Sequence, residues 1–457
     1  MIEMKNLELN LIVKTVIFSI LLIGLVACSK QDDDMGPGGN DDDPPVQFDP
    51  DNVSGEVSGI WGPNATYTIK GDVVIPEGES LEIREGVTII VDGDGGQGTS
   101  PEINVRGSLY CYGTEDARII FTVPEERRTV DNIFAGLWGG IIGTRTTQDM
   151  VFEYTDIEFT GALGEAGNSI VAEGEIDEGE PRYAIYFVNP EGNFIMWHSR
   201  IAYSKDDAIR MNGAKTLIAF SVFEFIGENG GEGLNAKRGT VGDMAYNLFY
   251  SVATNGLKAA NTRAEGPQID NYYYNNTFVN CGWRRAQSGR GGSLNYEAGA
   301  RGICYNNLVV NSRYGLRLVP PDREPDLANM EYGYQFYYGD EQEIVDQFHP
   351  SNGLIDFPNP SVGLPIPESD VYSEIPGEND PLFVNYDLGG SYDISAARNG
   401  SDVNFRSAAQ DFHLQAGSPA LTGAFTGFQP RFESYTVNGR TYTTPLPSEF
   451  FGAFGTR

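Results

Sequence analysis

Two neighbouring aspartates and one lysine are the residues of this sequence best suited to catalysis. Asp206 and Asp207 precede an apolar, strand-like segment, and Lys258 lies in the middle of a similar segment further along the chain. Adjacent carboxylates can bind Ca²⁺ or act as acid and base, and a lysine whose pKa is lowered can act as a base. An aspartate pair also commonly forms the turn before a strand. The spacing therefore permits catalysis without requiring it, and whether the protein is an enzyme stays open.

An arginine-rich segment lies between residues 281 and 317. It contains six arginines and a single acidic residue, Glu297, in a chain whose net charge is −33. Arginine pairs with carboxylate or sulfate groups through two hydrogen bonds, and the face of a tryptophan can stack on a sugar ring. These residue types predict a surface that binds an acidic or neutral glycan, made by Arg210, Lys258, Trp283, Arg284, Arg285, Arg290 and Arg317. The alternative is a loop that neutralises the acidic surface nearby or packs onto residues 322–378.

Composition and the motifs that are missing argue against several classes of protein. A net charge of −33 disfavours binding to nucleic acid, because phosphates would be repelled. Only three histidines occur and no HExxH motif is present, so we assign no metal site, and Ca²⁺ at the aspartates is the one cofactor left open. The sequence contains no GxSxG motif that would indicate a nucleophilic serine.

The elements that would position these residues come from a repeat. Short segments begin with a small polar residue and carry an apolar residue two positions later, at residues 155–159, 199–203, 221–225, 247–249, 276–278 and 307–309. Their starting positions differ by 44, 22, 26, 29 and 31 residues. The first spacing suits two coils of a stacked chain, and each of the others suits one. With 56 glycines and no long amphipathic helical pattern, the repeat predicts an all-β solenoid of short strands and tight turns.

A second strand-like segment follows each of the last five. It reads apolar, polar, apolar at residues 209–211, 234–236, 257–259, 294–296 and 316–318, which is the period of a strand with one buried face. The middle residues are Arg210, Asn235, Lys258, Asn295 and Arg317. Stacking of successive coils would align them about 4.8 Å apart as a polar strip on an exposed sheet. Asn276 and Leu294 are 18 residues apart, against 9 to 13 at the equivalent places. The additional residues, 283–292, form an arginine-rich loop that would project beside this strip.

These repeats resemble the right-handed parallel β-helix family that includes the pectate-lyase-like proteins. Ser221, Asn247, Asn276 and Asn307 fit the internal polar ladder of that family, because asparagine tolerates left-handed backbone angles and its amide bonds to adjacent coils. Residues 71–88, 103–109 and 138–141 look like the opening coils of bacterial surface proteins of this type, and 380–383 and 411–420 like their closing coils. The resemblance implies a single-stranded, right-handed parallel β-helix with irregular C-terminal coils. Lyases and hydrolases of this fold use carboxylates, calcium and basic residues on the outer sheet face.

The N-terminus predicts a lipid anchor. An apolar segment follows Lys14, and only 13 residues separate this lysine from Cys28, which is too short to span a bilayer. Residues 25–28 resemble a bacterial lipobox, and the resemblance implies that Cys28 is lipidated. Residues 29–34 resemble the acidic tag that sends some lipoproteins to the cell surface, and residues 36–45 have the composition of a solvated tether. We therefore expect an outer-membrane protein that faces the cell exterior.

These features divide the chain into a signal peptide, an acidic tether, a β-helix, and an irregular insertion with closing coils, at residues 1–27, 28–52, 53–321 and 322–457. We expect a lipid-anchored surface protein that binds extracellular polysaccharide or acts as an adhesin. The alternative is a polysaccharide lyase or glycoside hydrolase that acts on an acidic glycan. Besides Cys28 the chain has three cysteines, so at most one disulfide can form. Cys111 fits a buried position, and a Cys281–Cys304 pair is left open.

Overall fold

The computed structural model describes residues 49–93, 100–262, 266–287, 289–318, 323–349, 366–390 and 392–457. The chain divides into two units, Met1–Gln47 and Phe48–Arg457, and all described residues belong to the second. The predicted signal peptide, Cys28 and most of the tether lie outside the described residues. Within the described ranges, no helix is long and apolar enough to cross a membrane.

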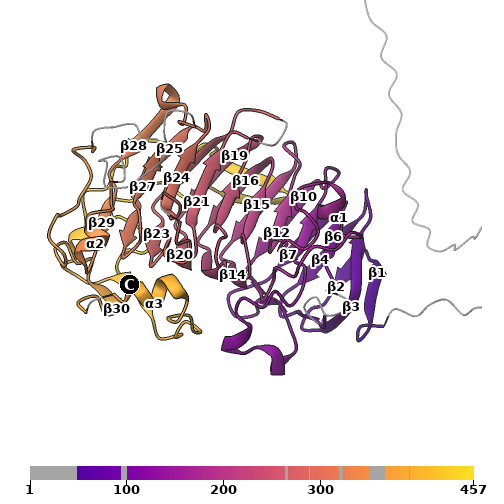
Figure 1. Ribbon diagram of the computed structural model, residues 1–457. Helices are drawn as coiled ribbons and strands as arrows, with labels where there is room; N and C mark the ends of the chain where they lie inside the picture. Colours follow the sequence, from indigo (N-terminus) through magenta and orange to yellow (C-terminus); the bar gives the residue numbers. More distant parts are fainter. Residues whose placement is uncertain are drawn as a thin grey trace, which may run out of the picture. The chain divides into compact units, whose positions relative to one another are not determined.

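The parallel β-strands of the described chain lie in two large sheets (Figure 1). Side chains alternate along these strands, as in β4, where Leu81 and Ile83 are buried and Ser80 is exposed. One sheet has ten strands in chain order. They are β2 (Gly59–Trp61), β4 (Ser80–Arg84), β7 (Ser108–Tyr112), β10 (Asp149–Glu153), β13 (Asn193–Trp197), β16 (Ala214–Ala219), β19 (Thr240–Ala245), β22 (Asp270–Tyr274), β25 (Gly302–Tyr305) and β28 (Met330–Gly333).

The other sheet has 19 strands and contains two parallel ladders that share β1 (Val53–Glu56) and β3 (Thr66–Ile75). The middle ladder continues through β5 (Thr88–Val91), β8 (Ile119–Thr122), β11 (Thr155–Glu158), β14 (Arg200–Ser204), β17 (Val222–Ile226), β20 (Leu248–Val252), β23 (Thr277–Val279), β26 (Leu308–Val310) and β29 (Phe336–Tyr338). The polar ladder, named for the side chains on its outer face, continues through β6 (Ile103–Val105), β9 (Ile141–Gly143), β12 (Ile185–Phe187), β15 (Ile209–Met211), β18 (Leu234–Ala236), β21 (Asn255–Ala260), β24 (Gly292–Glu297) and β27 (Leu316–Leu318).

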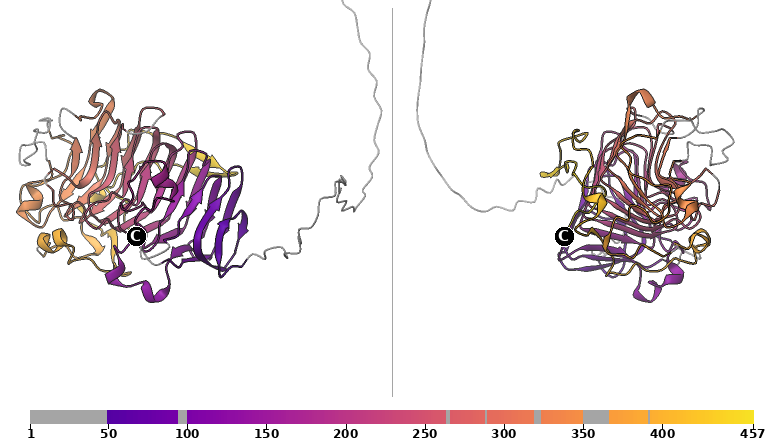
Figure 2. Two further views of the ribbon diagram at one scale, coloured as in Figure 1. Left: turned by 45° about the vertical axis from the view of Figure 1, so that its right-hand side comes forward. Right: turned by 90° about the vertical axis from the view of Figure 1, so that its left-hand side faces the viewer.

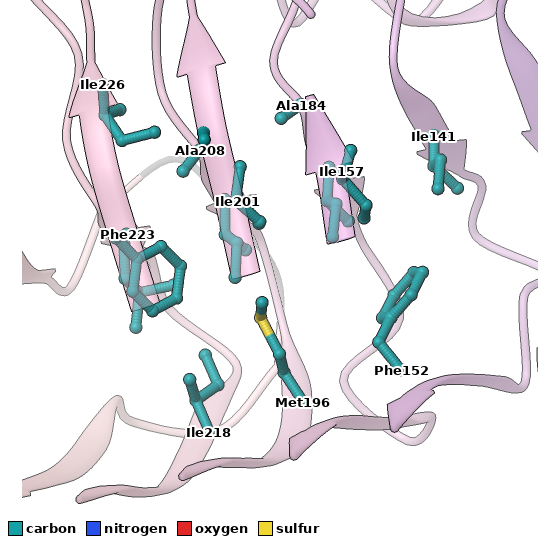
Figure 3. Close-up of a cluster of buried hydrophobic side chains, with 14 of the residues drawn as sticks. Ile141, Phe152, Ile157, Ala184, Met196, Ile201, Ala208, Ile218, Phe223 and Ile226 are labelled. Atoms are coloured by element: carbon teal, nitrogen blue, oxygen red, sulfur yellow. The ribbon is translucent and has the colours of Figure 1, made fainter. Parts of the chain in front are cut away.

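Successive coils stack through these ladders and enclose an apolar core. The coil β16–β17–β18, for example, pairs strand by strand with the coil β19–β20–β21. In Figure 3, side chains of the ten-stranded sheet face side chains of the middle ladder across the interior, with Phe152, Met196 and Ile218 opposite Ile157, Ile201 and Phe223. Like residues stack between coils, and the rings of Phe223, Phe249 and Phe278 lie 4.8 and 4.9 Å apart. The protein is therefore nearly all-β, and its long parallel sheets fit a parallel β-helix, as the sequence predicts.

The predicted internal polar ladder is present. It is a series of buried polar side chains, one at the start of each coil, and is distinct from the strands that are called the polar ladder. The side-chain oxygen of each member after the first accepts a hydrogen bond from the backbone N–H of the member before it, at 3.0 to 3.2 Å. The members are Ser199, Ser221, Asn247, Asn276 and Asn307, and the Asn307 amide continues the series by donating to Gln335. The left-handed backbone angles belong to the residues just before the members, including His198 and Tyr246, and not to the asparagines themselves. These preceding side chains form a stack, in which His198 lies between Tyr154 and Phe220.

Replacing Asn276 by alanine is expected to lower the free energy of unfolding by about 2 kcal/mol, because buried partners lose their hydrogen bonds. The Asn276 amide donates to Met244 O at 2.9 Å, and its oxygen accepts from Asn247 N at 3.1 Å. Chemical denaturation measures the change. Asn329→Ala, at an exposed asparagine that bonds only to Asp326 in the described chain, is the control. Equal stability of the two variants would contradict a stabilising role for the amide.

One repeat differs from the sequence prediction. The spacing of 44 residues between the first two segments corresponds to one coil and not two, because β11 pairs directly with β14 and places Ile157 beside Ile201. The additional residues form an insertion between β11 and β12, residues 159–184, which includes α1 (Ser169–Ala172). Ile170 and Ile176 of this insertion pack on Ile142 and Tyr186, which point outward from the polar ladder. The insertion therefore covers the outer face of this ladder at β9 and β12.

The C-terminal residues return along the coils (Figure 2). Of the segments that resemble closing coils, residues 380–383 end at the first residue of β30 (Phe383–Asn385) and residues 411–420 include β31 (Asp411–Leu414). These two strands pair antiparallel, unlike the strands of the stacked coils. β32 (Ser434–Val437) and β33 (Arg440–Thr443) form an antiparallel hairpin. Tyr435 and Tyr442 of this hairpin pack on Val151 and Leu217, on the outer face of the ten-stranded sheet. The C-terminal segment thus covers apolar sheet surface.

The remaining elements are short. They are the helices α2 (Gln342–Val345) and α3 (Ile394–Asn399) and the 3₁₀ turns Glu125–Arg127, Val130–Asn132, Leu327–Asn329 and Pro419–Leu421. The three cysteines of the described chain are free and buried, so Cys281 and Cys304 are not joined. Burial at Cys111 agrees with the sequence prediction, and burial raises the pKa of its thiol.

Candidate functional site

The outer face of the polar ladder carries the row of side chains that the sequence predicts. The strand register places Arg210 beside Asn235, Asn235 beside Lys258, Lys258 beside Asn295, and Asn295 beside Arg317. Each of these five side chains is at most 8 % exposed. The predicted alignment is confirmed, but the row is not the exposed strip that the sequence suggests, because carboxylates and loops pack over it.

Carboxylates from both sides compensate the buried cations of the row. Lys258 Nζ lies 3.4 Å from a carboxylate oxygen of Glu232 and 3.4 Å from one of Glu297. Asp207 Oδ1 accepts a hydrogen bond from Glu232 N at 2.7 Å, and its Oδ2 accepts one from Asn235 Nδ2 at 2.9 Å. Because an isolated charge is costly to bury, this alternation of charge allows the row to exist away from water.

Burial shifts the pKa values of the acids at the start of β15. Burial and the neighbouring charge of Glu232 raise the pKa of Asp206 to about 7, and the same two causes raise the pKa of Asp207 well above its ordinary value. Burial also acts to raise the pKa of Glu232, but the Lys258 ammonium and the hydrogen bond from Asp207 outweigh it and lower that pKa. Asp206 and Asp207 thus share a site with Glu232, a residue that the sequence analysis did not identify.

Lys237 is a second residue that the sequence analysis missed. It directly follows β18, and burial together with the positive charges of Lys258 and Arg210 lowers the pKa of its ammonium to about 7. The carboxylates of Glu232 and Glu297 act in the opposite direction. A lysine with this pKa can accept a proton near neutral pH. The one signal available in the sequence was its position directly after residues 234–236, the predicted strand that carries Asn235.

The shift at Lys237 predicts a pH-dependent stability. Between pH 7 and the ordinary lysine value of 10.5, the unfolded chain holds a proton that the folded chain has lost, so stability rises with pH in this window. The wild-type unfolding free energy is expected to gain at least about 1 kcal/mol relative to that of Lys237→Met between pH 7 and pH 10. Urea denaturation at both pH values tests this. Lys215→Met, at an exposed lysine, is the control and should show the wild-type rise.

The first two residues of the predicted arginine-rich loop have structural roles. Trp283 is 1 % exposed, and its Nε1 donates to Asn311 O at 2.8 Å. Arg284 is also buried and donates to Gly227 O, to Ile226 O and to both oxygens of Ser251 at 2.6 to 2.9 Å. A ring without an exposed face cannot stack on a sugar, which corrects the expectation of ligand contact for Trp283. The same correction applies to Arg284, because its donors are used within the protein.

The rest of this loop folds onto the end of the row. Arg317 donates to Gly289 O at 2.6 Å and to Gly291 O at 3.1 Å. Arg285 and Arg290 are the predicted binding residues that stay partly exposed. The loop therefore closes the β27 end of the row by packing on it, although the sequence predicts a projecting loop.

A polar pocket opens at the other end of the row, beneath the insertion. Its volume is about 660 Å³, within the range of ligand pockets. The lining includes Arg145, Glu173, Glu175, Asp177, Glu180, Tyr186, Asn189 and Asn212. Tyr186 lies beside Arg210 in the ladder, and a Glu175 carboxylate oxygen is 2.8 Å from an Arg210 guanidinium nitrogen. The pocket thus joins the row through Arg210.

The sequence-predicted residues fall into two groups. The first group lies with Glu232 and Lys237 and consists of Arg210, Lys258, Asp206 and Asp207, of which Arg210 also borders the pocket. The second group consists of the arginine-rich loop and Arg317, which contacts this loop at the opposite end of the row. Among the described residues, no group of three or more His, Cys, Asp or Glu side chains is arranged to hold a metal ion. No protein-family model, no curated protein and no solved structure matches this chain. The site must therefore be interpreted from its own chemistry.

Proposed function

We propose that this protein is a lipid-anchored outer-membrane protein, facing the cell exterior, whose pectate-lyase-like, right-handed parallel β-helix binds polysaccharide or acts as an adhesin. The lipobox-like residues that end at Cys28 and the acidic tether support the location. The long parallel ladders support the β-helix. The observation that carries the binding function is the polar pocket above the polar ladder, because its size and its many hydrogen-bonding groups suit a sugar.

Retention on immobilised polysaccharides tests the binding function. The full chain in detergent is passed over neutral, acidic and amine-bearing polysaccharides, and we expect retention on at least one. Asp177→Arg places a bulky, opposite charge in the pocket lining and is expected to weaken binding by about fivefold or more. Glu178→Arg makes the same change outside the lining of the pocket and should bind like wild type. Failure of every polymer to retain the wild type would refute the function, and equal binding by both variants would refute the site.

The anchor has its own test. Cells given a labelled palmitate analogue should incorporate the label into the wild-type protein, and Cys28→Ser should remove both the label and the attachment to the membrane fraction. Digestion of intact cells by an external protease reports whether the protein faces outward. A Cys28→Ser protein that keeps its label and stays in the membrane fraction would contradict lipidation at Cys28.

Polysaccharide lyase action is a second candidate, favoured by Lys237. A lyase removes a proton next to the carboxylate of a uronate, so it needs a base and a nearby cation. Lys237, with its pKa lowered to about 7, is close enough to Arg210 and Lys258 for their charges to affect it. A rise in ultraviolet absorbance from unsaturated sugar, with uronate polymers and with or without Ca²⁺, would support this candidate. A flat trace with wild type would exclude lyase action on those polymers.

A further inference from the structure

We infer that the pocket beneath the insertion binds a protonated amine, supplied by an amino-sugar unit of the polysaccharide. This inference rests on the proposed function and names the chemistry of its ligand. It replaces the acidic or neutral glycan that the arginine-rich segment suggests. The argument depends on two separate features of the pocket, its charge and one buried amide.

The charge of the pocket favours a cation. Four carboxylates, from Glu173, Glu175, Asp177 and Glu180, line it against a single guanidinium, from Arg145. Of the four, Glu175 is neutralised by Arg210 at 2.8 Å. The other three form no ion pair within 4 Å to any described residue. An acidic sugar would meet repulsion here, whereas an ammonium group would gain charge-assisted hydrogen bonds.

The side-chain oxygen of Asn212 receives no hydrogen bond from the described residues. This side chain is 5 % exposed and lines the pocket. Its Nδ2 donates to Glu175 at 2.8 Å and to the Tyr186 hydroxyl at 3.2 Å, which fixes the orientation of the amide. Its Oδ1 accepts no hydrogen bond from the described chain. Because an unsatisfied buried acceptor is costly, a ligand N–H or O–H donor at this point would be stabilising.

An amine suits these features better than a metal ion does. The described residues hold no cluster of three or more carboxylate, His or Cys ligands that could replace the hydration shell of Ca²⁺. An ammonium group needs only two or three acceptors, and it presents N–H donors to both a carboxylate and an amide oxygen. The hydroxyls of the same sugar can bond to the remaining polar groups of the lining.

Calorimetry with three ligands tests the inference on the full chain in detergent at pH 6.5. The ligands are a glucosamine oligosaccharide, the N-acetylated oligosaccharide of the same length, and spermidine. We expect the glucosamine oligosaccharide to bind at least about tenfold more tightly than its acetylated counterpart. Glu173→Gln, at an exposed residue of the lining, is expected to weaken this binding by about fivefold or more. Glu178→Gln, in the same insertion but outside the lining, should not.

The outcomes separate this inference from the proposed function. Equal affinity for the two oligosaccharides, with no effect of Glu173→Gln, would overturn the amine site and leave polysaccharide binding standing. Binding of spermidine that depends on Glu173, without binding of either oligosaccharide, would support the amine site and overturn the amino sugar as its ligand. If no ligand binds, the amine site is overturned, and retention on the wider set of polysaccharides decides the proposed function separately. Arg145→Gln removes the one guanidinium of the lining, at an exposed position, and is expected to strengthen binding of the amine, which no loss of folding could imitate.

Discussion

Replacing Arg182 by methionine is expected to lower the free energy of unfolding by about 3–5 kcal/mol, because it leaves a buried carboxylate without its partner. Arg182 Nη1 lies 2.7 Å from Glu102 Oε2, and neither side chain is exposed. The other guanidinium nitrogens donate to Ala162 O at 3.1 Å and to Ser100 O at 2.9 Å. This one side chain therefore ties both ends of the insertion to the coil that begins at β6.

A second substitution separates the charge from the packing. The double variant Arg182→Met with Glu102→Leu removes both charges, so it should be less destabilised than Arg182→Met alone. Arg106→Ala, at an exposed arginine of the same coil, is the control and should change stability little. Urea denaturation followed by circular dichroism measures all three. A single variant that is as stable as the control would show that the buried pair does not hold the insertion.

The same variants connect the fold to the site. The insertion supplies Glu173, Glu175, Asp177 and Glu180 to the pocket, so loosening it disperses these carboxylates. Ligand binding should therefore fall in parallel with the loss of the Arg182 contacts, although Arg182 does not line the pocket. Glu102 also accepts a hydrogen bond from Ser169 N at 3.3 Å, which places α1 against β6. The stability of the pocket thus depends on residues that do not line it.

The sequence predicts those parts of the fold that repeat. The alternation of apolar residues aligned Arg210, Asn235 and Lys258 correctly, because a period of two leaves a single choice of outward face for each short strand. The small polar residue at the start of each coil identified the internal ladder for a similar reason. Both features recur in every coil, so several weak local signals support one register.

Features that occur once were not predictable in the same way. A spacing of 44 residues equals two average coils, and only the pairing of Ile157 with Ile201 shows that it is one coil with an insertion. The charges in the sequence do not reveal which side chains are buried either. The lowered pKa of Lys237 depends on its contacts with neighbouring coils, and loop lengths set how far apart these coils lie in the sequence. The C-terminal strands alternate like coil strands, yet Tyr435 packs against the outside of the ten-stranded sheet. Long-range packing decides such cases.

Arg284 gives the strongest test of whether the arginine-rich loop is structural. Arg284→Ala is expected to lower the free energy of unfolding by about 3 kcal/mol, because the carbonyls of Gly227 and Ile226 lose a donor inside the protein. Burial lowers the pKa of its guanidinium to about 10. The Phe134 ring lies 4.9 Å from the guanidinium carbon and contributes a cation–π contact.

The neighbouring arginine is the matched control for this variant. Arg285 is partly exposed, and within the described chain its side chain donates one hydrogen bond, to Asn229 O at 3.3 Å, so Arg285→Ala is expected to change stability by less than about 1 kcal/mol. If the loop were a glycan-binding surface, both variants would weaken glycan binding and leave stability unchanged. If the loop is a packed element, Arg284→Ala unfolds at a lower denaturant concentration, whereas Arg285→Ala behaves like wild type in denaturation and in binding. The two neighbouring substitutions thus distinguish packing from recognition, because the side chains differ mainly in what the fold places around them.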